Sequence, residues 1–320
     1  MVVEAEKRWY LSPGTEQGLL RISITVVVAF AALGVVLGLL SHSFAIIFDG
    51  VYSLIDACMT VVGLLVVRLI AASNAGGLRN KRLIERFTMG FWHLEPIVLG
   101  VDALLLTGAA VYALINAIGS LAAGGREVHF DMAVAYAALT TVASFAMWRF
   151  QLRANRRIRS SFVALDSKGW LMSCLISGAL LAAFAGGLVV QDTRLDGVTP
   201  YIDPAVLALV CLVIIPIPMG TIRQALADIL LVTPADLKHH VDTVASQIVE
   251  SYGFLDYRAY VARVGRGRQI EIAFIIPPGE PARTMEEWDR LRDEISDAIG
   301  GDTPDRWLTI VFTADPEWAD

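Results

Sequence analysis

Long, almost uncharged apolar runs constrain this chain more than any other feature. Residues 19–40 read LLRISITVVVAFAALGVVLGLL and carry a single charged side chain. About 20 mostly apolar residues suffice for a helix to cross a bilayer. Five further runs of this kind occupy residues of about 44–70, 94–120, 131–150, 162–190 and 203–222. The sequence therefore predicts an α-helical membrane protein with six transmembrane helices, the fourth having the weakest run.

The overall composition supports a membrane protein and excludes other classes. Of the 320 residues, 55% are hydrophobic and 18% are charged, whereas soluble domains carry about a quarter charged residues. The net charge of −6 leaves no basic excess of the kind that nucleic-acid binding uses, so we expect no nucleic acid as a partner. No nucleophile–base pair, phosphate loop or cofactor fingerprint stands out, so we expect no enzymatic activity and no tightly bound cofactor.

The basic residues between the spans predict the orientation. Two loops, the one after the second run and the one after the fourth, are rich in arginine and lysine: Arg79, Lys81, Arg82 and Arg86, then Arg153, Arg156, Arg157 and Arg159. The other connections are poor in basic residues, and basic loops stay in the cytoplasm. We therefore expect a multi-pass protein of a bacterial inner membrane, surrounded by lipid, with both termini cytoplasmic.

The sequence changes character after the sixth run. Residues 1–18 are expected to form a cytoplasmic segment, residues 19–225 the six-helix membrane domain, and residues 226–320 a cytoplasmic α+β domain. The last part alternates a helical pattern, two strand patterns, an amphipathic helix and a final strand, WLTIVF. This order predicts a small ferredoxin-like unit with a three-stranded sheet covered by two helices on one side.

The second run contains carboxylates that a bilayer disfavours. It reads SFAIIFDGVYSLID, so Asp49 and Asp56 lie seven residues apart, about two helical turns, and share one helix face with Tyr52. A carboxylate near the bilayer centre costs roughly 3 kcal/mol, and such residues usually mark an ion path. Two other readings remain open: Asp49 lies solvated at the outer interface, or Asp56 bonds a neighbouring hydroxyl.

The fifth run resembles the second. SFVALDSK aligns with SFAIIFDG when one residue is dropped, which places Asp166 opposite Asp49. Transporters use internal repeats to build a site between two helices at the middle of the membrane. The alternative is that Asp166 and Lys168 follow a basic loop and extend to the membrane interface.

The motif SxAxxxDGxYxxxD in the second run resembles the signature of the cation diffusion facilitator transporters. Six spans with both termini inside, the third-span entry GFWHLEP and the α+β tail are similar to that family as well. The resemblance implies a dimeric secondary transporter that exchanges zinc, manganese, iron or cobalt for protons. It also implies a tetrahedral site with two ligands from the second span and two from the fifth.

The resemblance assigns ligand positions that this chain fills only in part. Tyr52 and Asp56 match the second-span pair, while Gly169 and Ser173 fall at the fifth-span pair, so Asp56 alone is a standard ligand. Zinc takes four nitrogen, sulfur or oxygen ligands, whereas an oxygen-dominated site suits manganese or magnesium better. The candidate metal residues are Asp56, Tyr52, Asp49, Ser173 and Asp166.

The expected function is therefore export of a divalent cation from the cytoplasm, with protons as the exchanged species and a site between the second and fifth spans. The cation is zinc, manganese, iron, cobalt or magnesium, and the resemblance implies a homodimer. Two alternatives remain because the ligand set is incomplete: the chain moves protons or another cation, or it is a non-transporting regulatory membrane subunit.

Overall fold

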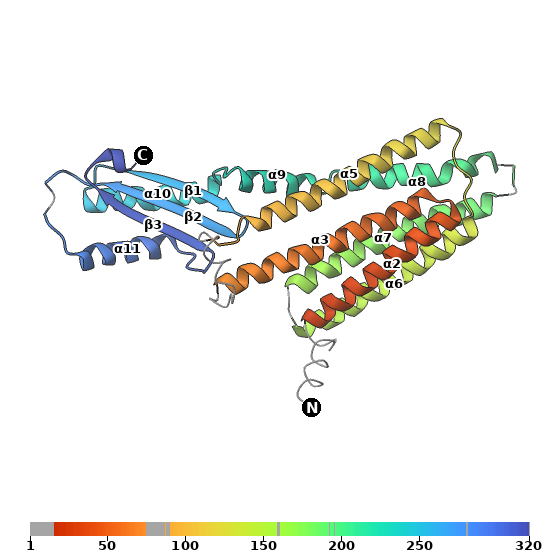
Figure 1. The fold of residues 1–320 in the computed structure, drawn as a ribbon, viewed down its shortest axis with the longest axis horizontal. Coiled ribbons are helices and arrows are strands. Elements are labelled where there is room, and N and C mark those ends of the chain that lie inside the picture. Colours follow the sequence, from red (N-terminus) through yellow and green to blue (C-terminus); the bar gives the residue numbers. More distant parts are fainter. Residues whose placement is uncertain are drawn as a thin grey trace, which may run out of the picture. The chain divides into compact units, whose positions relative to one another are not determined.

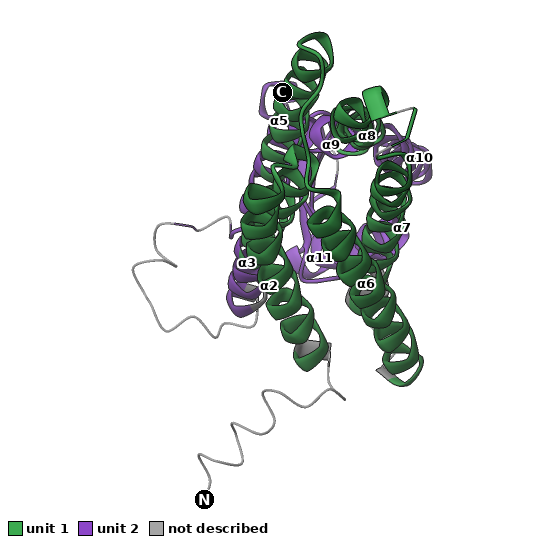
Figure 2. Cartoon of the chain, turned by 90° about the vertical axis from the view of Figure 1, so that its right-hand side faces the viewer, with its two compact units in different colours: residues 1–61, 102–219 green, residues 62–101, 220–320 purple. Residues whose placement is uncertain are grey.

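The structure is a computed structural model that describes residues 16–74, 87, 90–158, 161–191, 193–194, 196–279 and 281–319. The chain forms two compact units, coloured in Figure 2. Unit 1 comprises residues 1–61 and 102–219, and unit 2 comprises residues 62–101 and 220–320. The units reflect packing and not the membrane boundary, so the domain limits expected from the sequence stay a prediction.

Six helical segments of the described chain are long and apolar enough to cross a membrane, which confirms the predicted number of spans. Figure 1 labels the helices that form them. They are α2 (Glu16–Ser41), α3 (Phe44–Asn74), α5 (Leu94–Ala122), α6 (Phe130–Ile158), α7 (Ser161–Val190), and α8 (Thr199–Ile214) followed by α9 (Met219–Ile229).

Two spans differ from their predicted limits. Helix α6 continues beyond the apolar run through LRANRRI, because arginine and alanine favour a helix even where the sequence is polar. The sixth span begins earlier, at the short η1 helix (Asp196–Val198), and its α-helix stops at Ile214. Pro216 and Pro218 follow directly, and proline lacks the amide hydrogen and clashes with the preceding turn, so the chain forms turns before α9 begins.

The predicted orientation rests in part on residues outside the described chain. Arg79, Lys81, Arg82 and Arg86 fall in residues 75–86, and Arg159 falls in residues 159–160. Arg156 and Arg157 lie in the last turn of α6. The cytoplasmic placement of both termini therefore stays a prediction.

Small residues allow the helices of unit 1 to approach closely. A Cβ atom added to Gly50 of α3 would lie 2.8 Å from the carbonyl oxygen of Ala31 on α2, and one added to Gly34 would lie 3.1 Å from the Cα atom of Gly50. Membrane helices commonly pack through such small residues. The glycine of the DG pair in the second span thus brings α2 against α3 directly beside Asp49.

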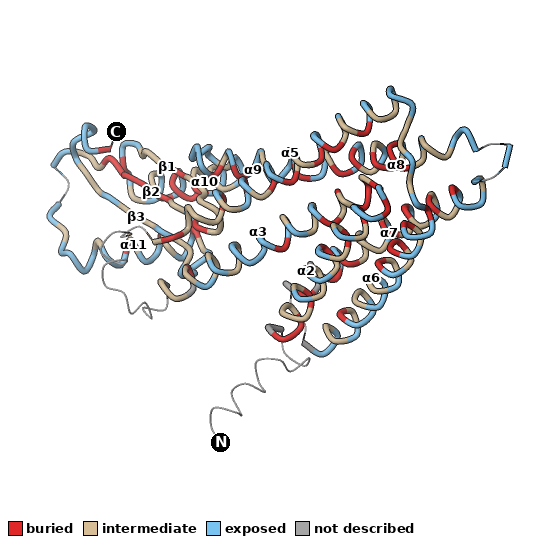
Figure 3. The backbone as a smooth tube through the Cα atoms, turned by 45° about the vertical axis from the view of Figure 1, so that its right-hand side comes forward, coloured by how far each residue is buried: buried red, intermediate tan, exposed pale blue. Residues whose placement is uncertain are grey.

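The C-terminal part of unit 2 has the predicted α+β arrangement. Helices α10 (Ala235–Tyr252) and α11 (Met285–Ile299) accompany strands β1 (Asp256–Val264), β2 (Gly267–Ile275) and β3 (Arg306–Thr313). The sheet order is β1-β2-β3, with β1 antiparallel and β3 parallel to β2. Figure 3 shows buried stretches along β2, whose residues Ile270, Ile272 and Phe274 pack in one core with residues of both helices.

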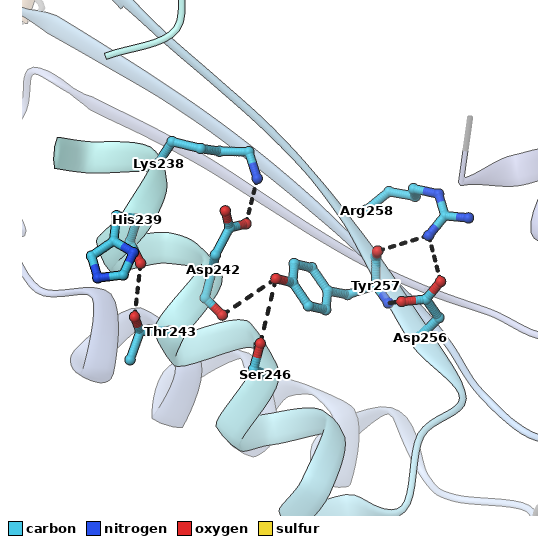
Figure 4. A network of polar contacts seen from close by, with 8 residues as sticks. All are labelled: Lys238, His239, Asp242, Thr243, Ser246, Asp256, Tyr257 and Arg258. Carbon is cyan, nitrogen blue, oxygen red and sulfur yellow. Dashed lines mark hydrogen bonds and ion pairs between the residues drawn. The ribbon is translucent and has the colours of Figure 1, made fainter. Parts of the chain in front are cut away.

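A polar network joins α10 to β1 on the surface of this unit, as Figure 4 shows. The Tyr257 hydroxyl lies 3.4 Å from the carbonyl oxygen of Asp242 and accepts a hydrogen bond from Ser246 over the same distance. Next to it, Arg258 pairs with Asp256 at 2.5 Å and lowers the pKa of that carboxyl group. The contacts of Tyr257 help to fix β1 against α10, whereas the Arg258–Asp256 pair lies within β1.

The turn between β1 and β2 contacts the beginning of α5 within unit 2. The guanidinium of Arg266 donates two hydrogen bonds to Glu95, Nε–Oε2 at 2.8 Å and Nη2–Oε1 at 3.2 Å, and its backbone amide donates a third to Oε2 at 3.3 Å. Gly265 has a positive φ of 60°, and Gly267 lies against the Trp92 ring, where an added Cβ would come within 2.6 Å of the ring carbons. The two glycines therefore let the turn approach α5 closely enough for the ion pair to form.

Candidate metal site

A cavity of about 330 Å³ lies inside unit 1, lined mainly by α3, α7 and α8. All five residues that the sequence nominated line it: Asp49, Tyr52, Asp56, Asp166 and Ser173. Their spacing explains this convergence, since positions three, four and seven residues apart share a helix face. The structure thus brings the candidates together, and their role as metal ligands stays a prediction.

Asp56 lies in this cavity without a hydrogen bond or ion pair to any described residue. It is exposed in the isolated chain, and it interacts electrostatically with Asp166 on α7. No lysine, arginine or histidine is among the described residues of the lining. The cavity therefore presents acidic groups from two helices with no cation of the protein's own between them.

Asp166 is held by a neighbouring helix. The Nε2 atom of Gln151 on α6 donates a hydrogen bond to the Asp166 Oδ2 atom at 2.5 Å, and Gln151 is fully buried. Lys168 is exposed and does not line the cavity. Asp166 thus lines the cavity and is also the first residue of its candidate span, so its extension to the membrane interface stays an open alternative.

Asp49 is tied to α6 by a tyrosine. The hydroxyl of Tyr136, which is 1% exposed, donates to the Asp49 Oδ2 atom at 2.8 Å. Asp49 also borders a second, small cavity of about 40 Å³, lined in part by hydroxyl groups that include Thr140, Ser144 and Ser177. A space of this size and polarity can hold a water molecule. Asp49 is thus less available to a cation than Asp56 is.

The two fifth-span positions that lack a standard ligand face the same cavity. Gly169 leaves open space, with no atom within 4 Å of an added Cβ. The Ser173 hydroxyl shares a hydrogen bond with Ser144 on α6 at 3.1 Å. Beside them, Trp170 donates from Nε1 to the Ser23 hydroxyl at 2.7 Å and fixes α7 against α2. Oxygen atoms therefore dominate the donor set, with the Met172 thioether as a softer donor in the lining.

The carboxylates do not form a ready-made ligand set. Among the described residues, no three His, Cys, Asp or Glu side chains lie close enough together to hold a metal ion. A hard cation such as Mg²⁺ usually keeps several water molecules and binds through one or two carboxylates. A cation in this cavity would therefore be held by few carboxylates, hydroxyl groups and water molecules.

Sequence reasoning missed three polar residues that act around the site. Tyr136 and Gln151 hold Asp49 and Asp166, as described above, and Asp203 of α8 caps α3. The Asp203 Oδ1 atom accepts hydrogen bonds from the Ser43 hydroxyl at 2.5 Å and the Ala45 amide at 3.3 Å, and Oδ2 accepts from the Phe44 amide at 3.1 Å. An acidic residue in the sixth apolar run was the signal for Asp203.

Comparison with known proteins identifies the family. The family described as the cation efflux transmembrane domain matches residues 20–230, more than half of the chain. The chain belongs to the cation efflux family. This confirms the resemblance inferred from the second-span motif, and it makes the chain a member of a family of membrane transport proteins.

One characterised relative of the cation efflux family is the manganese efflux system protein MneP of Bacillus subtilis (strain 168). The two sequences are 27% identical over 204 residues. The alignment covers 62% of this chain and 63% of the relative, so the chain matches less than two thirds of the relative's length.

Proposed function

We propose that this protein exports divalent metal cations from the cytoplasm and that the cavity between α3 and α7 is its cation site. The observation that carries the proposal is a cavity with Asp49, Asp56 and Asp166 in its lining and no basic described residue among them. Ionisable groups within membrane spans usually face such cavities and mark an ion path. Membership of the cation efflux family supports the same reading.

Manganese is the cation that the donor set favours. Carboxylate, hydroxyl and water oxygens suit manganese and magnesium, whereas zinc sites usually contain histidine or cysteine. The cavity lining has neither of these residues in the described chain. The manganese efflux relative points in the same direction.

Proton exchange is the coupling that carboxylates permit. A carboxylate binds a cation or a proton but not both well, since a nearby cation favours the charged form. Proton entry from outside would then release the cation, and cation binding from inside would release the proton. Dimerisation, which the family resemblance implies, is part of the same proposal.

A second function has a specific observation in its favour. The absence of three convergent metal-binding side chains among the described residues fits transport of protons or of another cation. A metal panel separates the two functions. Flux of manganese, magnesium, zinc, iron and cobalt into proteoliposomes is measured with and without an imposed pH gradient.

The matched variants are Asp56→Ala and Asp131→Ala, the latter an exposed acid in the first turn of α6 that lies outside the cavity. We expect saturable manganese flux that depends on the pH gradient, is lost in Asp56→Ala and persists in Asp131→Ala. Proton flux without any metal flux would support the second function, and full metal flux in Asp56→Ala would refute the site.

A further inference from the structure

Two histidines meet in unit 1, outside the candidate metal site. His42 lies in the short connection between α2 and α3, and His129 directly precedes α6. Both side chains are exposed, and their ring centroids lie 5.4 Å apart with the rings tilted by 60°. Neither residue lines either of the two cavities described above. The pair is therefore a second place in unit 1 where potential metal ligands come together from distant parts of the sequence.

His42 occupies a backbone position that normally takes glycine. The amide of Ser43 donates a hydrogen bond to the carbonyl oxygen of Gly38 at 3.1 Å, which closes the end of α2, and His42 has a positive φ of 59°. Helices often end in such a left-handed residue, usually glycine, because a Cβ atom makes this conformation strained. Glycine would therefore serve the turn better, so the imidazole at this position needs an explanation other than the turn itself.

Backbone contacts hold the two histidines in place. The His129 amide donates a hydrogen bond to the carbonyl oxygen of Ser41 at 3.0 Å, which joins the α5–α6 connection to the residue before His42. Ser41 is itself fully buried. The His129 carbonyl oxygen accepts a hydrogen bond from the Ala133 amide at 3.2 Å, in the first turn of α6. The approach of the two rings thus follows from a fixed backbone and not only from the rotation of exposed side chains.

The distance between the rings suits one shared metal ion. Zinc binds imidazole nitrogen at about 2 Å in tetrahedral geometry, so two imidazoles on one such ion have ring centroids about 5 Å apart. Histidine is the commonest metal ligand, and imidazole suits zinc, copper and nickel, whereas the cavity offers mainly oxygen atoms.

The charges around the pair favour a cation. Glu127 and Asp131 lie two positions on either side of His129, and both are exposed. Arg126, the one arginine or lysine between α5 and α6, places its guanidinium over the Phe44 ring, 5.3 Å from the centroid. Clustered charge of one sign raises the local concentration of counter-ions, so the two acids attract cations to the histidines.

We propose that His42 and His129 bind one divalent cation of the zinc, copper or nickel type and that this cation links the α2–α3 connection to the α5–α6 connection. The described residues contain no group of three His, Cys, Asp or Glu side chains that could hold a metal, so water completes the coordination. The site differs from the proposed cavity site in its ligand chemistry and in lying between candidate spans instead of within them. It does not depend on the proposed function.

The first test measures zinc binding to the full-length protein in detergent by isothermal titration calorimetry. Asp56→Ala is the background, so that the proposed cavity site does not dominate the signal, and His42→Gly or His239→Gln is added to it. Glycine adopts the positive φ readily, so His42→Gly removes the ring and keeps the turn. We expect His42→Gly to weaken zinc binding by about tenfold or more, since even outer-shell partners of metal sites change affinity by about 10–100-fold. His239, an exposed histidine of α10, is the matched control, and His239→Gln is expected to leave zinc binding unchanged.

A second measurement needs no variant. Diethyl pyrocarbonate modifies accessible imidazoles, and mass spectrometry of peptides reports the extent of modification at each histidine. Zinc is expected to protect His42 and His129 together and to leave His239 as reactive as in the metal-free protein. Manganese, which favours oxygen ligands, is expected to protect neither His42 nor His129 at the same concentration.

The outcomes separate this inference from the proposed function. Zinc binding that His42→Gly leaves unchanged overturns the pair as a metal site, and so does zinc that protects neither histidine or only one of them. Neither result alters the manganese flux expected of the cavity site. A protein that transports no divalent cation refutes the proposed function and leaves zinc binding by the two histidines in place.

Discussion

Asp203 and Asp56 are both carboxylates of membrane-spanning helices, but they differ in burial and in their hydrogen-bond partners. Asp203 is 1% exposed and accepts three hydrogen bonds, one from Ser43 just before α3 and two from the first two residues of α3. Asp56 is exposed to the cavity and receives no hydrogen bond from the described residues. Asp49, with one hydrogen bond from Tyr136, lies between these extremes.

The difference shows that an acid within a span is not by itself a sign of function. A carboxylate with all its acceptors filled contributes to stability, because it satisfies amide groups that a helix start leaves unpaired. A carboxylate without partners contributes no such stabilisation, and this is why we propose a cation as the partner of Asp56. The number of internal hydrogen bonds therefore distinguishes Asp203, which stabilises the start of α3, from Asp56, which we propose to bind a cation.

Asp203→Ala is expected to give the largest effect on stability. The substitution leaves the amides of Phe44 and Ala45 without their acceptor, which costs about 2–5 kcal/mol in the free energy of unfolding. Thermal unfolding in detergent measures the loss. Asp203→Asn keeps one carbonyl acceptor and should lose less, while Asp56→Ala should unfold within about 1 kcal/mol of the wild type. If Asp203→Ala and Asp56→Ala lost equal free energy of unfolding, the proposed difference between the two acids would be wrong.

Tyr136→Phe tests the intermediate case. The variant removes the hydroxyl that donates to Asp49 and keeps the buried ring, so we expect a loss of about 1–2 kcal/mol in the free energy of unfolding. Cation flux should fall moderately, because Asp49 loses its fixed position but keeps its charge. The control is Tyr112→Phe, an exposed tyrosine of α5 outside the cavity. If Tyr136→Phe lost cation flux as completely as Asp56→Ala, Asp49 would be a cation ligand and not a residue that mainly stabilises the fold.

The sequence predicts most of the fold because length, apolarity and periodicity are local properties. The six runs, the break near Pro216 and Pro218, and the order of elements in the tail all follow from neighbouring residues. Helical spacing also places Asp49, Tyr52 and Asp56 on one face, and this is the face that lines the cavity. The candidate site residues could be predicted from the sequence for the same reason.

The contacts that distinguish the acids could not be predicted. Ser43 and Asp203 are separated by 160 positions, and Tyr136 and Asp49 by 87. Which residues meet depends on how each helix is rotated and how closely glycines let it approach its neighbour. Because the spans carry few charges, the sequence makes every acid in them an equal candidate for the site. Only the packed structure shows which acids have hydrogen-bond partners within the protein.

Glu95→Gln is expected to have the smallest effect, and it extends the comparison to unit 2. Glu95 and Arg266 form a two-point ion pair in which both side chains keep contact with solvent, 22% and 30% exposed. Water screens such pairs, which contribute about 0–1 kcal/mol, and added salt reduces that further. The variant keeps one acceptor for Arg266, so the loss in the free energy of unfolding should lie at the lower end of this range and diminish between low and high salt.

Arg258→Gln, which breaks the more exposed pair with Asp256, is the matched control and should lose no more free energy of unfolding than Glu95→Gln does. A loss in Glu95→Gln as large as that of Asp203→Ala, and insensitive to salt, would show that the β1–β2 turn and the start of α5 depend on a desolvated charge pair. The contrast between the buried, hydrogen-bonded Asp203 and the water-exposed ion pair at the start of α5 would then no longer hold.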